Sequence, residues 1–214
     1  GLDVLGISRS KPNEPINWLK FDIGEDPTDL INSHQPDVIL HLAWGGLPNY
    51  QSLHHFEVEV PKSYKFLALA VKAGVKKVIV LGTCFEYGMQ SGELTEKMLI
   101  QPSNPYGFAK ATLLRQLQFL RKETPFELSW LRLFYMFGEG QASSSLYSLF
   151  TSAVAQDKKI FDMSKGDQIR DFLAVSEVVR LIARVCTLEQ GTDILNICSG
   201  EPKSIRALVE EWRV

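Results

Sequence analysis

Tyr106 and Lys110 stand four positions apart in the segment Pro-Tyr-Gly-Phe-Ala-Lys, at the head of an amphipathic run. Positions i and i+4 share one face of a helix, so the phenol and the ammonium group are expected to be neighbours. A nearby cation stabilises a phenolate, so Lys110 is predicted to lower the pKa of Tyr106 from its usual value of about 10. Such a Tyr can act as an acid or a base near neutral pH.

Thr83 ends a buried-looking, strand-like run earlier in the chain. Its hydroxyl is expected to bind the same substrate oxygen that exchanges a proton with Tyr106. Together these groups offer the chemistry needed to move a hydride onto or off a carbinol carbon. The Tyr-x-x-x-Lys spacing arises by chance in many helices, so the order of the surrounding elements has to support this interpretation.

Short apolar runs alternate with amphipathic runs along the chain and predict an α/β fold with a doubly wound parallel sheet, covered by helices on both faces. Pro61 is expected to kink the second helix or to lie in its first turn. The predicted strands are Val4–Ile7, Trp18–Phe21, Val38–Ala43, Val78–Leu81, Leu128–Phe134 and Ile194–Cys198. The predicted helices are Pro27–Ser33, Leu53–Ala73, Tyr106–Lys122, Ser144–Ala155, Val175–Leu188 and Ser204–Trp212.

Polar or glycine-containing segments follow the first four predicted strands. Ligands of such sheets bind at the carboxyl ends of the strands, near the point where the strand order reverses. These segments are therefore expected to lie together at one edge of the sheet, although any surface loop can carry such residues. They are Ser8-Arg9-Ser10, Asp22, His41–Gly46 and Gly82-Thr83-Cys84.

The composition is that of an ordinary globular protein, with 45% hydrophobic and 22% charged residues and a formal net charge of −2 over 214 residues. The length suits one large domain or one and a half. No basic excess indicates nucleic acid, and no apolar run reaches the roughly 18 residues of a membrane span. The odd set of distant cysteines (Cys84, Cys186 and Cys198) predicts reduced thiols in a cytoplasmic protein. The four histidines show no metal-ligand spacing, so no metal is expected.

A dinucleotide site usually needs a glycine-rich turn between a first strand and a helix, to hold the pyrophosphate. This sequence has no G-x-G-x-x-G pattern, and its first strand already leads into Ser8-Arg9. The fold is therefore expected to lack its first β–α unit, through truncation or omission. The sequence also stops at Trp212-Arg213-Val214, within a helical pattern.

Several motifs, taken in order, resemble the extended short-chain dehydrogenase/reductase family of nucleotide-sugar epimerases, dehydratases and reductases. The resemblance covers essentially the whole sequence. The motifs are Pro-Asp-Val-Ile-Leu-His-Leu-Ala, Ala-Gly-Val-Lys-Lys-Val-Ile-Val-Leu-Gly-Thr, Tyr-Gly, Asn-Pro-Tyr-Gly-Phe-Ala-Lys, Leu-Arg-Leu-Phe-Tyr-Met-Phe-Gly, Ile-Arg-Asp-Phe-Leu-Ala-Val and Asn-Ile-Cys-Ser-Gly-Glu-Pro.

The resemblance implies a catalytic triad in which Thr83 holds the substrate oxygen, Tyr106 is the acid or base, and Lys110 tunes Tyr106 and binds the nicotinamide ribose. For Thr83 the alternative is a strand-end cap. The resemblance also implies an incomplete Rossmann-type domain (1–137 with 174–197) and a small substrate-binding lobe (138–173 with 198–214). The helices near 53–73 and 106–122 often pair across a two-fold axis in this family, which implies a homodimer.

The cofactor-binding residues implied by the resemblance are Ser8, Arg9, Asp22, Ile23, Leu42, Ala43, Tyr106 and Lys110. NAD-preferring members usually carry an acidic residue at the position of Ser8, to bind the ribose hydroxyls. A Ser followed by Arg9 favours NADP over NAD, because a guanidinium can bind a 2′-phosphate through two hydrogen bonds. The alternatives are a solvated Arg9, a loop cap for Asp22 and a core strand for Leu42 and Ala43.

The implied substrate-binding residues are Trp44, Cys84, Phe85, Tyr135 and Arg170. Arg170 matches the family Arg that grips the nucleotide diphosphate, and the alternative is a structural ion pair with its Asp neighbour. Trp44 would shape a sugar pocket or would belong to the core.

Four positions depart from the family pattern and narrow the activity. Sugar-nucleotide 4,6-dehydratases carry an Asp-Glu pair directly after the catalytic Thr, where this sequence has Cys84-Phe85. Glu86 comes one residue later and would point to the opposite face if the segment stayed extended. A dehydratase is therefore disfavoured. The usual Asn residues are replaced by Tyr135 and Glu59, which puts the standard substrate contact and the local backbone arrangement in doubt.

Four hypotheses follow from these residues. The preferred one is an NADP-dependent reductase of a 4-keto-6-deoxy sugar nucleotide. The second is a nucleotide-sugar 4-epimerase that uses the same triad and retains its NAD. The third is a catalytically silent fold that binds a dinucleotide, and the fourth is a fragment that is inert without its phosphate-binding unit. A nucleotide sugar is the expected partner, with no nucleic acid and no membrane.

Overall fold

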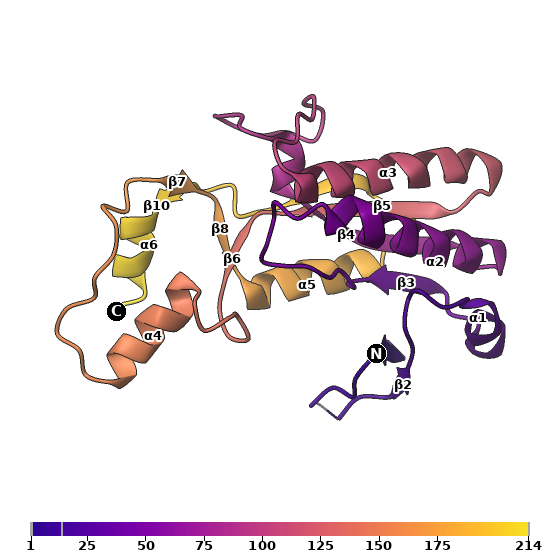
Figure 1. Cartoon of the computed structure of the whole chain (residues 1–214), viewed down its shortest axis with the longest axis horizontal. Coiled ribbons are helices and arrows are strands. Elements are labelled where there is room, and N and C mark those ends of the chain that lie inside the picture. The colour runs from indigo at the N-terminus through magenta and orange to yellow at the C-terminus, as the bar shows by residue number, and fades with distance from the viewer. Residues whose placement is uncertain (1, 14, 214) are drawn as a thin grey trace.

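The computed structural model describes residues 2–13 and 15–213, so predictions at Gly1 and Val214 lie outside the described residues. A four-stranded parallel sheet of order β3-β4-β5-β9 forms its centre (Figure 1). The strands are β3 (Val38–His41), β4 (Lys77–Thr83), β5 (Glu127–Leu133) and β9 (Asp193–Ile197). The predicted parallel sheet is confirmed here, with each of these strands displaced by at most a few residues at its ends.

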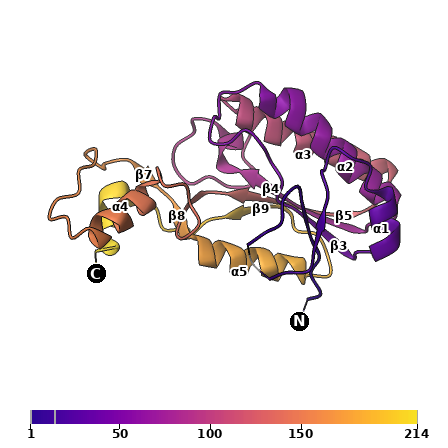
Figure 2. The ribbon, with the colours of Figure 1, turned by 60° about the horizontal axis from the view of Figure 1, so that its bottom comes forward.

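Helices cover both faces of this sheet, as predicted. Helices α2 (Val60–Lys72) and α3 (Pro105–Glu123) pack side by side on one face, and α5 (Val175–Cys186) lies on the other (Figure 2). Side chains alternate along β4 accordingly: Val78 and Val80 join the core under α2 and α3, while Ile79 joins the core under α5. Strands buried on both faces explain the continuous apolar runs of the sequence.

The segment predicted as one helix from Leu53 to Ala73 is two elements. A π-helical stretch, His55–Glu59, leads directly into α2. Pro61 lies in the first turn of α2, where its missing N–H has no helical partner to lose, which confirms one of its two predicted placements.

The first two strands form a separate parallel pair, β1 (Gly6–Ser8) with β2 (Trp18–Lys20), before α1 (Thr28–His34). The predicted parallel strands are thus divided into two groups in the described residues, and the first strand begins two residues later than predicted. A doubly wound sheet of order 3-2-1-4-5-6 has one strand between these two groups. None of the described residues forms that strand, which agrees with the expected lack of a first β–α unit.

The last part of the chain forms a smaller group of elements beyond the carboxyl ends of β5 and β9 (Figure 1). None of the four short strands in this group was predicted from the sequence. Aromatic rings of Phe137, Tyr147, Phe150 and Trp212 pack together at its centre. The elements are β6 (Tyr135–Phe137) parallel to β8 (Phe172–Ala174), β7 (Ile169–Arg170) antiparallel to β10 (Lys203–Ser204), α4 (Leu146–Ala155) and α6 (Ile205–Glu211).

Candidate active site

The start of α3 is built by the Asn-Pro-Tyr-Gly motif. The Asn104 side chain caps the helix by accepting the Gly107 N–H at 2.8 Å, and Pro105 occupies the first turn. A Cβ at Gly107 would lie 2.5 Å from the carbonyl oxygen of Phe85, so only glycine lets the helix approach the chain this closely. Tyr106 and Lys110 are thereby held beside the carboxyl end of β4.

Lys110 is almost completely buried, with 3% of its surface exposed. Its Nζ donates to the carbonyl oxygen of Leu81 at 2.8 Å and lies 3.8 Å from the centre of the Trp44 ring. Burial lowers the pKa of Lys110 to about 7, because the low-dielectric surroundings disfavour the ammonium form, and the charges of Glu86 and Glu59 act in the opposite direction.

Tyr106 lies in a cluster of aromatic rings. Its ring centroid is 5.2 Å from that of His55, 5.5 Å from Tyr50, 6.1 Å from Phe85 and 6.2 Å from Trp44. Burial raises the pKa of Tyr106 above its ordinary value, and only part of this effect is offset by the neighbouring Thr83 side chain. The phenol is therefore protonated at neutral pH.

The prediction that Lys110 lowers the pKa of Tyr106 is wrong for this structure. The Lys110 Nζ lies 5.9 Å from the centre of the Tyr106 ring. Desolvation is the largest influence on both groups: it raises the pKa of Tyr106 and lowers the pKa of Lys110. Their proximity was predicted correctly, but the direction of the electrostatic effect was not.

Thr83 is the last residue of β4 and caps a 3-10 turn formed by Cys84–Tyr87. Its Oγ1 accepts the Phe85 N–H at 3.3 Å, while its own N–H donates to Oε1 of Glu86 at 2.9 Å. The cap that was weighed as an alternative role for Thr83 is therefore present. A capping oxygen still carries a hydroxyl hydrogen, so the cap leaves a donor for a substrate.

Glu86 is fully buried, and the extended segment on which its predicted orientation depended is a 3-10 turn instead. The 3-10 turn directs it under β4 and β5, where Oε2 receives Nε of Arg132 at 2.8 Å and Oε1 receives Nε1 of Trp130 at 2.8 Å. Burial raises the pKa of Glu86, against the attraction of Arg132. Because Glu86 also accepts the Thr83 N–H, this network holds the backbone of Thr83 in position.

Apart from Tyr106 and Lys110 in α3, the residues predicted to bind the cofactor lie at or just after the carboxyl ends of β1, β2 and β3. Asp22 accepts the Gly24 N–H at 2.7 Å and pairs with Nζ of Lys62 at 2.6 Å, so it serves here as a loop cap. These contacts, with the charge of Arg9, lower the pKa of Asp22. The remaining members are Ser8, which accepts Nε1 of Trp18, the half-buried Ile23, and the exposed Leu42 and Ala43.

Four of the residues predicted to bind substrate form two contacting groups. The Phe85 ring packs against Tyr50, with centroids 5.0 Å apart, and Cys84 precedes Phe85 in the same turn. In the second group the guanidinium of Arg170 lies over the Tyr135 ring at 5.5 Å and donates to the Ile169 carbonyl at 2.7 Å.

Burial raises the pKa of Cys84 to about 11, and the charge of Arg170 acts in the opposite direction. Trp44 instead packs with Lys110 and donates its indole N–H to Nδ1 of His55 at 3.1 Å. Trp44 thus belongs to the walls of the Lys110 site.

Sequence reasoning missed several residues of this site. The carbonyl oxygen of Tyr50 accepts the Tyr106 N–H at 3.2 Å, and His55 lies fully buried between Trp44 and Tyr106. Glu59, noted only as a departure, pairs with Nε2 of His54 at 3.0 Å. Neither Tyr50 nor His55 stands in a regular spacing with the motif residues, so no pattern could have identified them.

Within residues 2–13 and 15–213, no cluster of three or more His, Cys, Asp or Glu side chains could hold a metal ion. All three cysteines are free thiols. None of the helices in this part of the chain has the length and apolar character to cross a bilayer.

The arrangement can bind a polar ligand at a water-poor position and pass it a proton. Lys110 has three N–H donors, and among the described residues its Nζ has a single oxygen acceptor, so it keeps donors for a ligand. This spare donor capacity, beside Thr83 and Tyr106, fits the ribose hydroxyls of a nicotinamide dinucleotide.

Known proteins are similar to this chain over most of its length. Residues 1–198 match the NAD dependent epimerase/dehydratase family. The chain is 33% identical over 191 residues to dTDP-6-deoxy-L-talose 4-dehydrogenase (NAD(+)) of Aggregatibacter actinomycetemcomitans, covering 88% of this chain and 68% of that protein. It is 26% identical over 216 residues to dTDP-4-dehydro-6-deoxyglucose reductase of Escherichia coli, covering 92% and 67% respectively.

A solved structure, MoeE5 in complex with UDP-glucuronic acid and NAD, is similar with a TM-score of 0.78 and 24% identity. The match covers 97% of this chain and 72% of that one. At this identity the likeness shows a shared fold, and it confirms the Rossmann-type architecture. The chain spans about two thirds to three quarters of the length of the proteins compared with it here.

Proposed function

Since the chain belongs to the NAD dependent epimerase/dehydratase family, we propose that it is an NAD(P)-dependent oxidoreductase that reduces a 4-keto-6-deoxy sugar nucleotide. The observation that carries the proposal is the convergence of Thr83, Tyr106 and Lys110 at the carboxyl end of β4. The dehydrogenase and reductase relatives, whose names specify dTDP-linked 6-deoxy sugars, support this substrate class.

Each member of the triad has a distinct role. The Thr83 hydroxyl donates a hydrogen bond to the keto oxygen, and Tyr106 gives that oxygen its proton. The nicotinamide, when bound, supplies the hydride. Lys110 holds the ribose with the N–H donors that Leu81 leaves free.

The raised pKa of Tyr106 keeps the phenol protonated at neutral pH. This is the form that reduction needs, because the oxygen of the reduced sugar takes its proton from Tyr106.

We assign the 1–137 and 174–197 segments to the cofactor and the 138–173 and 198–214 segments to the sugar. Ser8 and Arg9 stand where a 2′-phosphate is distinguished from a ribose hydroxyl, which supports NADP as the preferred cofactor. The relative named for NAD(+) makes NAD the alternative. Arg170, held over Tyr135, is assigned to the diphosphate.

A homodimer through α2 and α3 belongs to the same proposal. These helices and the preceding π-helical stretch expose Val58 at 43%, Phe108 at 51% and Phe119 at 53%. Phe56 of the π-helical stretch and Phe108 of α3 pack edge to face, with centroids 5.9 Å apart. Sedimentation should show a dimer that Phe108→Glu dissociates, and a monomeric parent protein would contradict it.

The test of activity is a direct assay with dTDP-4-dehydro-6-deoxyglucose and either NADPH or NADH, following consumption of the reduced nicotinamide. Tyr106→Phe removes the proton donor and is expected to lower turnover by about 10²–10⁴-fold. Its affinity for the reduced cofactor should stay within a few-fold. Tyr64→Phe is the matched control. Tyr64 lies in α2 and packs against the hydrophobic core, so this variant should keep full activity.

Two results would contradict the proposal. Unchanged turnover in Tyr106→Phe would remove the catalytic assignment. An NAD that stays bound through purification and never exchanges with NADPH would instead indicate the retained-cofactor epimerase.

A further inference from the structure

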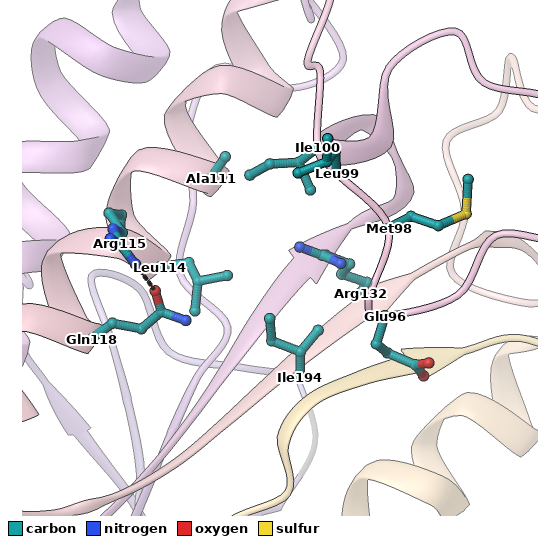
Figure 3. Close-up of a pocket in the computed structure, with 10 residues that line it drawn as sticks. All are labelled: Glu96, Met98, Leu99, Ile100, Ala111, Leu114, Arg115, Gln118, Arg132 and Ile194. Carbon is teal, nitrogen blue, oxygen red and sulfur yellow. Dashed lines mark hydrogen bonds between the residues drawn. The ribbon is translucent and has the colours of Figure 1, made fainter.

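A pocket of ≈ 320 Å³ lies behind α3, away from the aromatic cluster around Tyr106. Figure 3 shows its walls, which come from α3, from the ends of β5 and β9, and from the loop at 96–100. Most of the wall is aliphatic. The residues that matter here are Met98, Ile100, Ala111, Leu114, Arg132 and Ile194.

The one deeply buried charge in this wall is Arg132, which is 2% exposed. Its Nε is bound to Glu86, but its Nη1 is buried and has no hydrogen-bond partner among the described residues. Figure 3 shows the guanidinium directed toward the middle of the pocket. A buried N–H without an acceptor is rare, so this group calls for an acceptor from a ligand.

The other charged groups of the pocket are already engaged. Glu96 turns away from Arg132 in Figure 3 and accepts the Asn196 N–H at 2.9 Å. Arg115, at the exposed rim, donates to Gln118 at 3.2 Å. Glu86 already neutralises Arg132, and Glu96 lies in the same wall. A doubly charged phosphate would therefore be repelled more strongly than a singly charged carboxylate, which can accept the free Nη1–H.

We propose that this pocket binds a small aliphatic monocarboxylate, with its carboxylate on Arg132 and its alkyl chain against Leu114, Ile100 and Ile194. Its volume is at the lower end of the roughly 300–1,000 Å³ of ligand pockets, which suits a chain of about six carbons. The site is distinct from the candidate active site, although Arg132 connects the two through Glu86, which accepts the Thr83 N–H.

The test uses sodium hexanoate as the probe and the methyl resonances of Met98, Leu114 and Ile194 as the readout. Saturable shifts are expected with hexanoate, binding at least about tenfold weaker with 1-hexanol, and none with inorganic phosphate. The absence of saturable shifts, equal binding of 1-hexanol, or tighter binding of phosphate would each overturn the proposal.

Substitutions in the pocket wall test where hexanoate binds. Ala111→Leu adds volume inside the pocket and keeps a residue of high helix propensity in α3, so it should weaken hexanoate binding at least about tenfold. Arg115→Gln, the matched control at the rim, should bind within about twofold of the parent.

Replacing Arg132 alone would leave Glu86 buried without its partner, so the paired variant Glu86→Gln with Arg132→Met is used to remove both charges. It should abolish binding. Loss of binding in Arg115→Gln, or full binding in Ala111→Leu, would overturn the proposal even if the paired variant did not fold.

Discussion

Two buried lysines mark the opposite ends of β4. Lys77, at its amino end, is 5% exposed, and its Nζ donates to Val185 O at 2.8 Å, to Cys186 O at 3.3 Å and to Leu188 O. Lys110, beside the carboxyl end of the same strand, is 3% exposed and donates only to Leu81 O. The same side chain is thus fully satisfied at one end and only partly satisfied at the other.

The difference shows how one strand separates stability from chemistry. The ammonium of Lys77 meets the last carbonyl groups of α5, where the helix dipole also favours a positive charge. Lys110 has fewer partners, a pKa lowered to about 7 and donors to spare. A buried ammonium with three acceptors holds the fold together, whereas one with a single acceptor is available to a ligand.

The largest effect is expected from Lys110→Met. This substitution removes the proposed ribose donor and should lower turnover by about 10²–10⁴-fold. The free energy of unfolding should not fall, since an apolar side chain of similar size replaces a desolvated charge. Steady-state kinetics and denaturant unfolding measure the two quantities, with Lys122→Met on the exposed side of α3 as the control. Full turnover in Lys110→Met would contradict the comparison.

The pH dependence of stability provides the next largest effect. The pKa of Lys110 is about 7 in the folded chain and about 10.5 when exposed, so between these values the unfolded state binds more protons. The stability of the parent relative to Lys110→Met should therefore be flat below pH 7 and rise above it, by at most about 1.4 kcal/mol per pH unit. Urea titrations from pH 6 to about pH 9 measure this difference. A difference that does not change with pH would contradict the lowered pKa.

Lys77→Met tests the other end of the strand. Three buried carbonyl groups lose their donor, and the free energy of unfolding should fall by about 1–3 kcal/mol. Turnover should stay at the parent value, because the change lies at the amino end of β4. Lys76→Met, at the exposed neighbouring position, is the matched control. Loss of activity in a fully folded Lys77→Met would show that the amino end of β4 also affects catalysis, and would contradict the comparison.

The smallest effect is expected from Trp44→Leu. The Trp44 ring stabilises the ammonium form of Lys110 at 3.8 Å, so its loss should lower the pKa of Lys110 by up to about one unit. The rise in relative stability should then begin below pH 7. Trp44→Tyr retains an aromatic face and should preserve the parent profile. An identical onset in the two variants would show that the ring makes no contribution.

Local pattern was enough to predict the elements that carry the triad. The helix predicted at Tyr106–Lys122 is α3, because its apolar spacing and its Asn-Pro start are local signals. The strand predicted at Val78–Leu81 is the centre of β4. The proximity of Tyr106 and Lys110 followed from helical spacing alone.

The parts that were missed depend on contacts distant in the sequence. Lys77 donates to Val185 at the end of α5, which lies 108 positions later in the sequence. Glu86 binds Arg132, which lies 46 positions later. The direction of the Tyr106 pKa shift depends on how completely the rings of Tyr50 and His55 exclude water, which spacing does not encode. The two-residue strands β7 and β10 exist only because they pair with each other.

The cap at Thr83 has a consequence for the choice of residue at that position. Its oxygen already receives the Phe85 N–H, so a lone pair is occupied and the hydroxyl hydrogen is the part left to face outward. Serine could serve the same two purposes, whereas Val, of nearly the same shape, could serve neither. A single oxygen thus closes the turn behind it and gives the opposite side the polarity that an incoming carbonyl requires.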